Sequence, residues 1–117
     1  MARSRLEITL QKQCTKYLEA AIPKPPHGPF YTAINPIPGS SPRLGQLAKD
    51  MGLRAGVPDF IFLIKGKLYG VELKVGRGGL SDNQSICHAD MIKAGAEMFT
   101  VKSLDAFIDT VKEIIAS

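Results

Sequence analysis

Two apolar runs in the middle of this 117-residue chain constrain its fold more than any other feature. They cover residues 60–64 and 68–75, and Lys65, Gly66 and Lys67 lie between them. β-Branched and aromatic residues on both sides of a glycine-containing turn predict a β-hairpin. We therefore expect a domain built around a β-sheet, with this hairpin near its centre.

The hairpin carries three charged side chains among its apolar residues. With Gly66 and Lys67 as the turn, the predicted pairs are Ile64 with Tyr69, Ile61 with Glu72, and Asp59 with Lys74. Because side chains alternate along a strand, Asp59, Glu72 and Lys74 are predicted to project from one face. The other face is predicted to be apolar, with Phe60, Phe62, Val71, Leu73 and Val75. One face of the sheet thus gathers two carboxylates and an amine.

This charged group has two interpretations. Lys74 could neutralise Asp59 or Glu72 in a structural salt bridge, because an unpaired charge is costly to bury. Alternatively, the two carboxylates could hold a divalent metal ion, with the lysine beside a bound water or a scissile phosphate. The residue types alone leave both interpretations open.

The order of these residues resembles a known nuclease motif. Pro58-Asp59, a gap of twelve residues and then Glu72-Leu73-Lys74 resembles the core of the PD-(D/E)xK nucleases. The wider pattern is similar to the VRR-NUC branch of that superfamily, in Gly52-Leu53-Arg54-Ala55-Gly56-Val57-Pro58-Asp59, Gly76-Arg77, Leu80-Ser81 and Gln84. The resemblance is strongest over residues 47–101. It implies an α/β fold with a restriction-endonuclease-like αβββαβ core, in which helices flank a mixed sheet of about four strands.

The resemblance also implies an activity. Members of this branch are metal-dependent nucleases, so it implies an endonuclease that hydrolyses DNA phosphodiester bonds. Asp59, Glu72 and the backbone carbonyl of Leu73 would hold Mg²⁺ or Mn²⁺, and Lys74 would orient the attacking water. The implied substrate is branched DNA, such as a Holliday junction, in replication or repair. A unit of this kind without attached domains looks like a phage or bacterial protein.

Glu7 and Gln84 each have two possible roles. Ser4 with Glu7, and Ser81 with Gln84, have the spacing of helix capping boxes. In the family, however, an acidic residue on the first helix reaches toward the metal or its waters, and Glu7 matches it, with Glu19 as the second choice. The family's glutamine at the position of Gln84 faces the active site. The sequence leaves both roles open.

Basic residues and histidines are the remaining candidates. Arg54 matches a basic position in the family, and with Lys49 and Arg77 it is expected to contact substrate phosphates. His27 and His88 lack partners at metal-ligand spacing, so we expect them at the surface or in an outer shell around the site.

The remaining elements follow from periodicity and capping. The sequence predicts a helix from Leu6 to Pro23, a strand at 30–35, a short helix at 44–51, a helix at 81–94, a strand at 96–101 and a final helix capped by Ser103. Residues 1–117 are too few for a second core, so we expect one domain. The final helix, Phe30, Tyr31 and Ile37 offer apolar surfaces for a homodimer.

Composition sets further bounds. No apolar run approaches the roughly 18 residues of a membrane span, and the N-terminus lacks the apolar segment of a signal peptide. We therefore expect a cytoplasmic protein, with Cys14 and Cys87 reduced. The net charge of +4 gives weak support to a nucleic-acid substrate. Two alternatives remain: a catalytically silent nucleic-acid-binding module, and an interaction subunit whose carboxylates form a structural ion pair.

Overall fold

A computed structural model describes residues 5–34 and 42–117, with the side chains of 42–45 left out. Its elements are α1 (Arg5–Ala21), β1 (Phe30–Ala33), α2 (Pro42–Asp50), β2 (Phe60–Ile64), β3 (Lys67–Leu73), α3 (Asp82–Lys93), β4 (Glu97–Val101) and α4 (Leu104–Ala116). Types and order agree with the sequence prediction. Ser4, Asn35 and Ile37, which that prediction used, lie outside the described residues.

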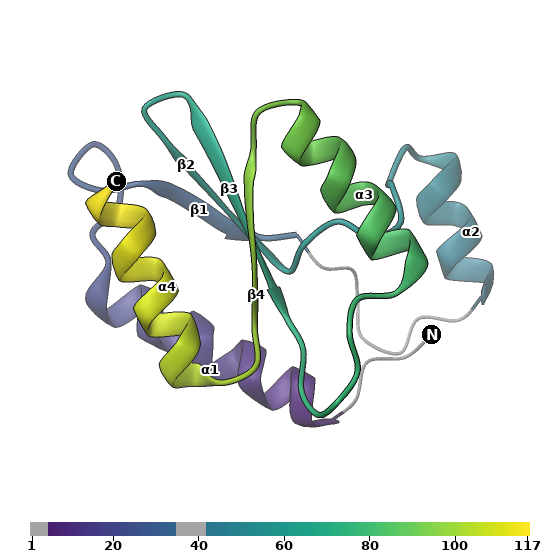
Figure 1. The fold of residues 1–117 in the computed structure, drawn as a ribbon, viewed down its shortest axis with the longest axis horizontal. Helices are drawn as coiled ribbons and strands as arrows, with labels where there is room; N and C mark the ends of the chain where they lie inside the picture. The colour runs from purple at the N-terminus through teal and green to yellow at the C-terminus, as the bar shows by residue number, and fades with distance from the viewer. Residues whose placement is uncertain (1–4, 35–41) are drawn as a thin grey trace.

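The four strands form one mixed sheet in the order β1-β2-β3-β4 (Figure 1). β1 and β3 each pair antiparallel with β2, whereas β4 pairs parallel with β3. A parallel pair needs a crossover, and α3 supplies it between β3 and β4. This is the mixed α/β architecture expected of a restriction-endonuclease-like core.

The register of the hairpin differs from the predicted one. Ile64 pairs with Lys67 and Phe60 with Val71, so the turn residues are Lys65 and Gly66, not Gly66 and Lys67. Both turn residues have positive φ, 49° and 83°, as a tight two-residue hairpin turn requires. Lysine is an uncommon residue at such a position, which is why the sequence favoured the next dipeptide.

The shift of pairing is two residues, so every side chain keeps its predicted face. Phe60 and Val71 form a pair on the core side of the sheet. Asp59, one residue before Phe60, is therefore level with Glu72 instead of Lys74. The two carboxylates are closer along the strands than the sequence predicted.

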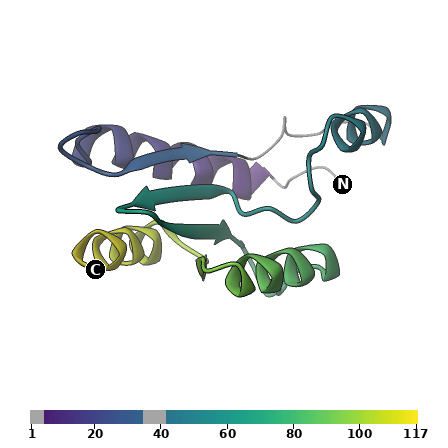
Figure 2. The ribbon, with the colours of Figure 1, turned by 90° about the horizontal axis from the view of Figure 1, so that it is seen from above.

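The main core lies between the sheet and two helices, α1 and α4. Phe60, Phe62 and Val71 are buried against Leu18 of α1 and Phe107 of α4. The Phe107 ring centroid lies 5.4 Å from that of Phe60 and 6.5 Å from that of Tyr17. α1 and α4 also contact each other, and Figure 2 shows α4 and α3 one beside the other along the lower edge of the view. In the described part of the chain, no helix is long and apolar enough to cross a bilayer.

Candidate active site

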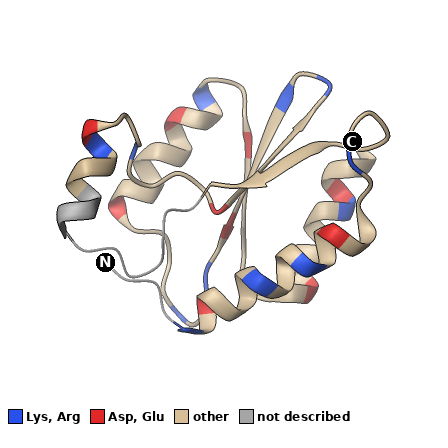
Figure 3. Cartoon of the chain, turned by 180° about the vertical axis from the view of Figure 1, so that it is seen from behind, with Lys and Arg blue, Asp and Glu red and all other residues tan. Residues whose placement is uncertain are grey.

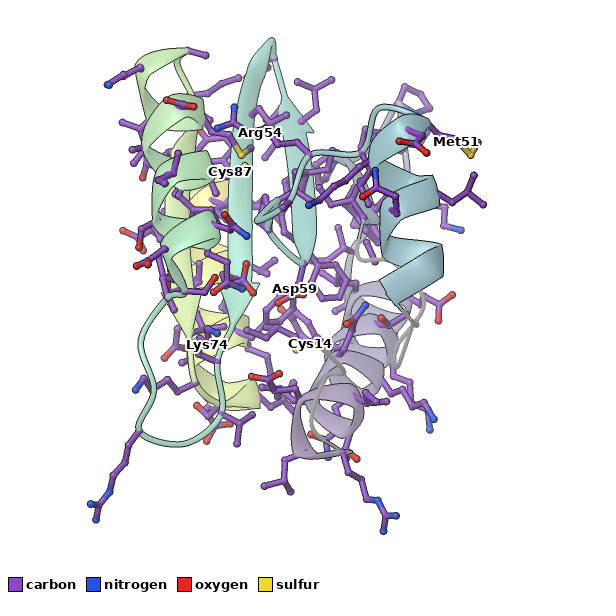
Figure 4. The ribbon with its side chains drawn as sticks, turned by 90° about the vertical axis from the view of Figure 1, so that its right-hand side faces the viewer. Cys14, Met51, Arg54, Asp59, Lys74 and Cys87 are labelled. Atoms are coloured by element: carbon purple, nitrogen blue, oxygen red, sulfur yellow. The ribbon has the colours of Figure 1, made fainter. Side chains whose placement is uncertain are left out.

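Asp59 and Glu72 are both buried, and each residue exposes only 3% of its surface. Asp59 Oδ2 accepts a 2.7 Å hydrogen bond from the backbone N–H of Leu73. This bond ties the carboxylate that precedes β2 to the end of β3, directly beside Glu72. The predicted carboxylate pair is therefore held on adjacent strands. Figure 4 shows Asp59 between α1 and the end of the strands.

Gln84 completes the capping box of α3 and also contacts Glu72. Its Oε1 accepts a 2.9 Å hydrogen bond from the Ser81 backbone, while its own backbone N–H donates to Ser81 Oγ at 3.2 Å. The same side chain donates from Nε2 to Glu72 Oε2 at 3.1 Å. One amide therefore caps α3 with its oxygen and holds a site carboxylate with its nitrogen.

His88 lies on the same face of α3, one turn beyond Gln84, and is only 5% exposed. Its Nε2 lies 3.5 Å from Glu72 Oε1. Burial lowers the pKa of His88, although a hydrogen bond with the Gly56 backbone and the charge of Asp59 act in the opposite direction. The prediction of a surface position for His88 was wrong; the alternative outer-shell position agrees with this geometry. The four-residue spacing from Gln84 was the available signal.

Gly56 allows the segment that leads to Asp59 to lie against α3. Its φ is +92°, and a Cβ atom at this position would lie 2.3 Å from the carbonyl oxygen of Asn83. Any side chain would force the segment away from the start of α3. The packing of this segment against α3 therefore requires glycine at position 56.

Lys74 follows Glu72 by two residues and is partly buried on the same side of the strand. Its backbone N–H donates to the Val101 carbonyl at 2.9 Å, which fixes the chain where β3 ends. The ion pairs of the described residues do not include Lys74, so the salt-bridge interpretation gains no support. Figure 4 shows Lys74 below Asp59, toward the lower end of the strands.

α1 passes close to Asp59. Burial, and then the charge of Asp59, raise the pKa of the Cys14 thiol to about 12. Glu7 is partly buried and lies about 10 Å before Cys14 along the same helix. Within residues 5–34 and 42–117, no three His, Cys, Asp or Glu side chains are grouped so that they could hold a metal ion. Glu7 is therefore not gathered with the two carboxylates into a direct ligand set.

The basic candidates lie at the surface. Arg54 pairs with Asp90 of α3, and this contact lowers the pKa of Asp90. Asp90 lies about 9 Å beyond Gln84 along α3, and Figure 4 shows Arg54 near Cys87, well above Asp59. Lys49 and Arg77 are exposed, as is His27. Figure 3 shows acidic residues both in the central strands and on the helices, and basic residues on the helices, on the hairpin and in loops.

A solved structure described as "VRR_NUC domain protein" is similar to this chain, with a TM-score of 0.75. The alignment covers 97% of this chain and 91% of the other, at 19% sequence identity. The chain has the VRR-NUC fold. Comparison with protein-family models gave no match, and neither did comparison with curated proteins.

The VRR-NUC fold accounts for the spacing of the motif in this sequence. Asp59 directly precedes β2, Glu72 is near the end of β3, and Gln84 is in the first turn of α3. The antiparallel hairpin places the first two together, and the turn of the chain after β3 returns the third to them. At 19% identity the likeness concerns architecture, so the chemistry has to be argued from the site itself.

Proposed function

We propose that this chain is a metal-dependent endonuclease that hydrolyses phosphodiester bonds in DNA. The observation that carries the proposal is the pair of buried carboxylates, Asp59 and Glu72, on one face of a VRR-NUC fold. Each receives a hydrogen bond from a neighbouring N–H group, and together they form a rigid anionic site. Burying two like charges side by side is costly unless a cation offsets them.

The donor set suits a hard divalent ion. Mg²⁺ and Mn²⁺ prefer oxygen ligands, and Mg²⁺ typically keeps several waters with one or two protein carboxylates. Asp59, Glu72 and the Leu73 carbonyl would supply three oxygens, and water would complete the shell. Glu7 would act through a water, which agrees with its place outside any direct side-chain cluster.

The bound ion would polarise the scissile phosphate and lower the pKa of a coordinated water. The protein's own residues would do the rest. Lys74 would orient the attacking water and offset the negative charge that develops on the phosphate. Gln84 would keep the Glu72 carboxylate in place through its amide nitrogen, which already lies 3.1 Å from Oε2.

Arg77, Lys49 and Arg54 would contact phosphates on either side of the cleaved bond. Arg77 and Lys49 project from exposed positions that a duplex could reach. Arg54 would have to exchange Asp90 for a phosphate, so its contribution would be the weakest of the three. The net charge of +4 favours association with a polyanion.

The substrate and assembly follow from size and resemblance. The molecule measures 40 × 30 × 25 Å, so one copy spans about one turn of duplex DNA. Cutting two strands at a branch calls for two sites, and a two-fold homodimer would supply them. We propose branched, Holliday-junction-like DNA as the substrate, in replication or repair, in the cytoplasm of a bacterial or phage-infected cell.

The direct test is incubation of the protein with branched, flapped and linear DNA in Mg²⁺, in Mn²⁺ and in EDTA. The proposal predicts cleavage with either metal, none in EDTA, and the fastest reaction on branched DNA. Preferential cleavage of linear DNA would contradict the proposed substrate, and equal cleavage in EDTA would contradict the metal dependence.

A second candidate is a nucleic-acid-binding module that does not cleave. In such a module the hydrogen bonds from Leu73 and Gln84 would hold the two carboxylates for structural reasons alone. The same experiment separates the two functions. A silent module would bind branched DNA in EDTA and leave it intact in both metals.

A further inference from the structure

Three basic side chains form a row along α1 that the proposed mechanism does not use. Arg5, Lys12 and Lys16 are separated by seven and then four residues, so they lie within about 40° of one another around the helix axis. All three are exposed. The row is about 16 Å long, and Figure 3 shows basic residues along α1, the lower helix in that view. We call these three residues the α1 basic row.

The α1 basic row points away from the core. The buried residues of α1 are Leu10, Cys14 and Leu18, which lie on the opposite side of the helix. Asp59 lies on that inner side, because its charge acts on Cys14 and Figure 4 shows it between α1 and the end of the strands. The row is therefore separated from the carboxylate site by the thickness of a helix, about 10 Å.

The positive charge of this row is not offset by ion pairs. Among residues 5–34 and 42–117, the ion pairs include none of its three members. Glu19 lies at the far end of α1, and its charge acts on β1, since burial and then Glu19 raise the pKa of Tyr31. α4 has the opposite balance, with three acidic residues and one basic residue. The row is thus an exposed cationic surface on one helix.

A DNA backbone fits this surface. Phosphates repeat about every 3.4 Å along each strand of a duplex, so the row spans about five nucleotides. Exposed lysine and arginine side chains are common phosphate contacts. A strand bound at Asp59 and Glu72 meets the inner side of α1, and a straight duplex does not turn around the helix to reach its outer side. A second arm of a branched molecule can.

This inference rests on the proposed function, in which DNA is cut at the two carboxylates. We propose that the α1 basic row binds a second duplex arm of a branched substrate while the first arm occupies the carboxylate site. Linear DNA fills the site and leaves the row empty. Preference for branched over linear DNA then arises within a single chain, from two surfaces on opposite sides of α1.

The test compares two double variants with the wild type. One combines Lys12→Gln with Lys16→Gln, and the matched control combines Lys93→Gln with Lys112→Gln. Both remove two positive charges from exposed helical positions, and glutamine has a good helix propensity. Fluorescence anisotropy in EDTA measures binding of a four-way junction and of a linear duplex of equal length at several salt concentrations. Thermal unfolding establishes that each variant is folded.

The α1 double variant should bind the junction about 10- to 100-fold more weakly than the wild type at about 0.1 M salt, and the slope of log affinity against log salt should fall by about two. Its affinity for the linear duplex, and both affinities of the control, should be unchanged. Wild-type affinity and slope on the junction would overturn the inference.

Two further results would also overturn it. Equal losses on the junction and on the linear duplex would make the row a general phosphate contact, and an equal loss in the control would reduce the effect to net charge. A wild type that neither binds nor cuts either DNA would overturn the proposed function and this inference together, whereas a wild type that cuts the junction, with no specific loss in the α1 variant, would overturn the inference alone.

Discussion

At the scale of single residues, the site combines two buried carboxylates with one amine on the same side of the strand. Asp59 and Glu72 each accept a hydrogen bond from an N–H donor, whereas the hydrogen bond of Lys74 among the described residues is made by its backbone. This difference suggests separate roles for the carboxylates, in metal binding, and for the lysine, in catalysis. In the proposed mechanism the carboxylates would hold a metal ion, and the lysine would act on water or phosphate.

Lys74→Met should remove turnover and keep metal binding. Methionine fills a similar volume but has no charge to orient water or to offset the developing negative charge. A cleavage assay with calorimetry of Mn²⁺ binding measures both properties. Lys102→Met, which removes an exposed amine bonded to the Gly76 carbonyl, is the matched control. Normal cleavage by Lys74→Met would leave the lysine without a catalytic role.

Cys14 should be unreactive in the folded protein. Burial and the charge of Asp59 raise its thiol pKa from 9.0 to about 12, so the folded state favours the protonated thiol. That contribution to stability is fully present below pH 9 and is lost as the pH rises toward 12. Mass spectrometry after iodoacetamide treatment at pH 8 should find Cys14 alkylated only when denaturant is present. Rapid alkylation of the native protein would contradict this placement of α1.

At the scale of elements, the first turn of α3 both stabilises the helix and contacts the site. Its capping box begins at Ser81, and the residue that completes the box also holds Glu72. The sequence contained the capping pattern, and the family resemblance implied that Gln84 faces the site. Neither predicted that the amide oxygen of Gln84 caps the helix while its amide nitrogen contacts Glu72.

Two substitutions in this first turn should have opposite effects. Ser81→Ala removes the cap and should cost about 1 kcal/mol of unfolding free energy, with cleavage retained. Gln84→Glu keeps a good capping residue but places a second carboxylate against Glu72, so cleavage should fall while the helix stays capped. Denaturant unfolding and a cleavage assay measure the two effects. Equal loss of cleavage in both variants would show that the cap alone matters.

The hairpin shows where sequence reasoning succeeds and where it stops. Alternation assigned each side chain to its face, and that assignment holds because a two-residue shift preserves it. The register failed because the turn uses Lys65 at positive φ, a conformation that residue type does not favour. The sequence predicted only that His88 lies at the surface or in an outer shell around the site. Its burial depends on contacts with Gly56 and β3, which are distant from it in sequence.

At the scale of the whole molecule, the fold is small enough that one copy presents one site. The surface includes exposed apolar residues at both ends: Phe30 and Leu63 beside Ile115, and Leu47, Met51 and Leu53 around α2. Met51 is 78% exposed, which is high for a methionine. These surfaces are compatible with assembly.

A homodimer is the predicted assembly. Static light scattering at micromolar concentration should give about twice the 12.7 kDa mass of one chain, with or without junction DNA. A mass of one chain, unchanged when junction DNA is added, would contradict the dimer. Nicking or flap cutting by a single copy would then be the better proposal.

The most direct test of the central claim is the cleavage of a labelled four-way junction in Mg²⁺ by four proteins: wild type, Asp59→Asn, Glu72→Gln and Asp82→Asn. Asp82 is an exposed carboxylate in the first turn of α3 and provides the matched control. The wild type and Asp82→Asn should cut at similar rates, and both site variants should be inactive while unfolding at or above the wild-type temperature, since each relieves a buried like-charge pair. Full Mg²⁺-dependent cleavage by either site variant would contradict the assignment of Asp59 and Glu72 as the metal-binding pair.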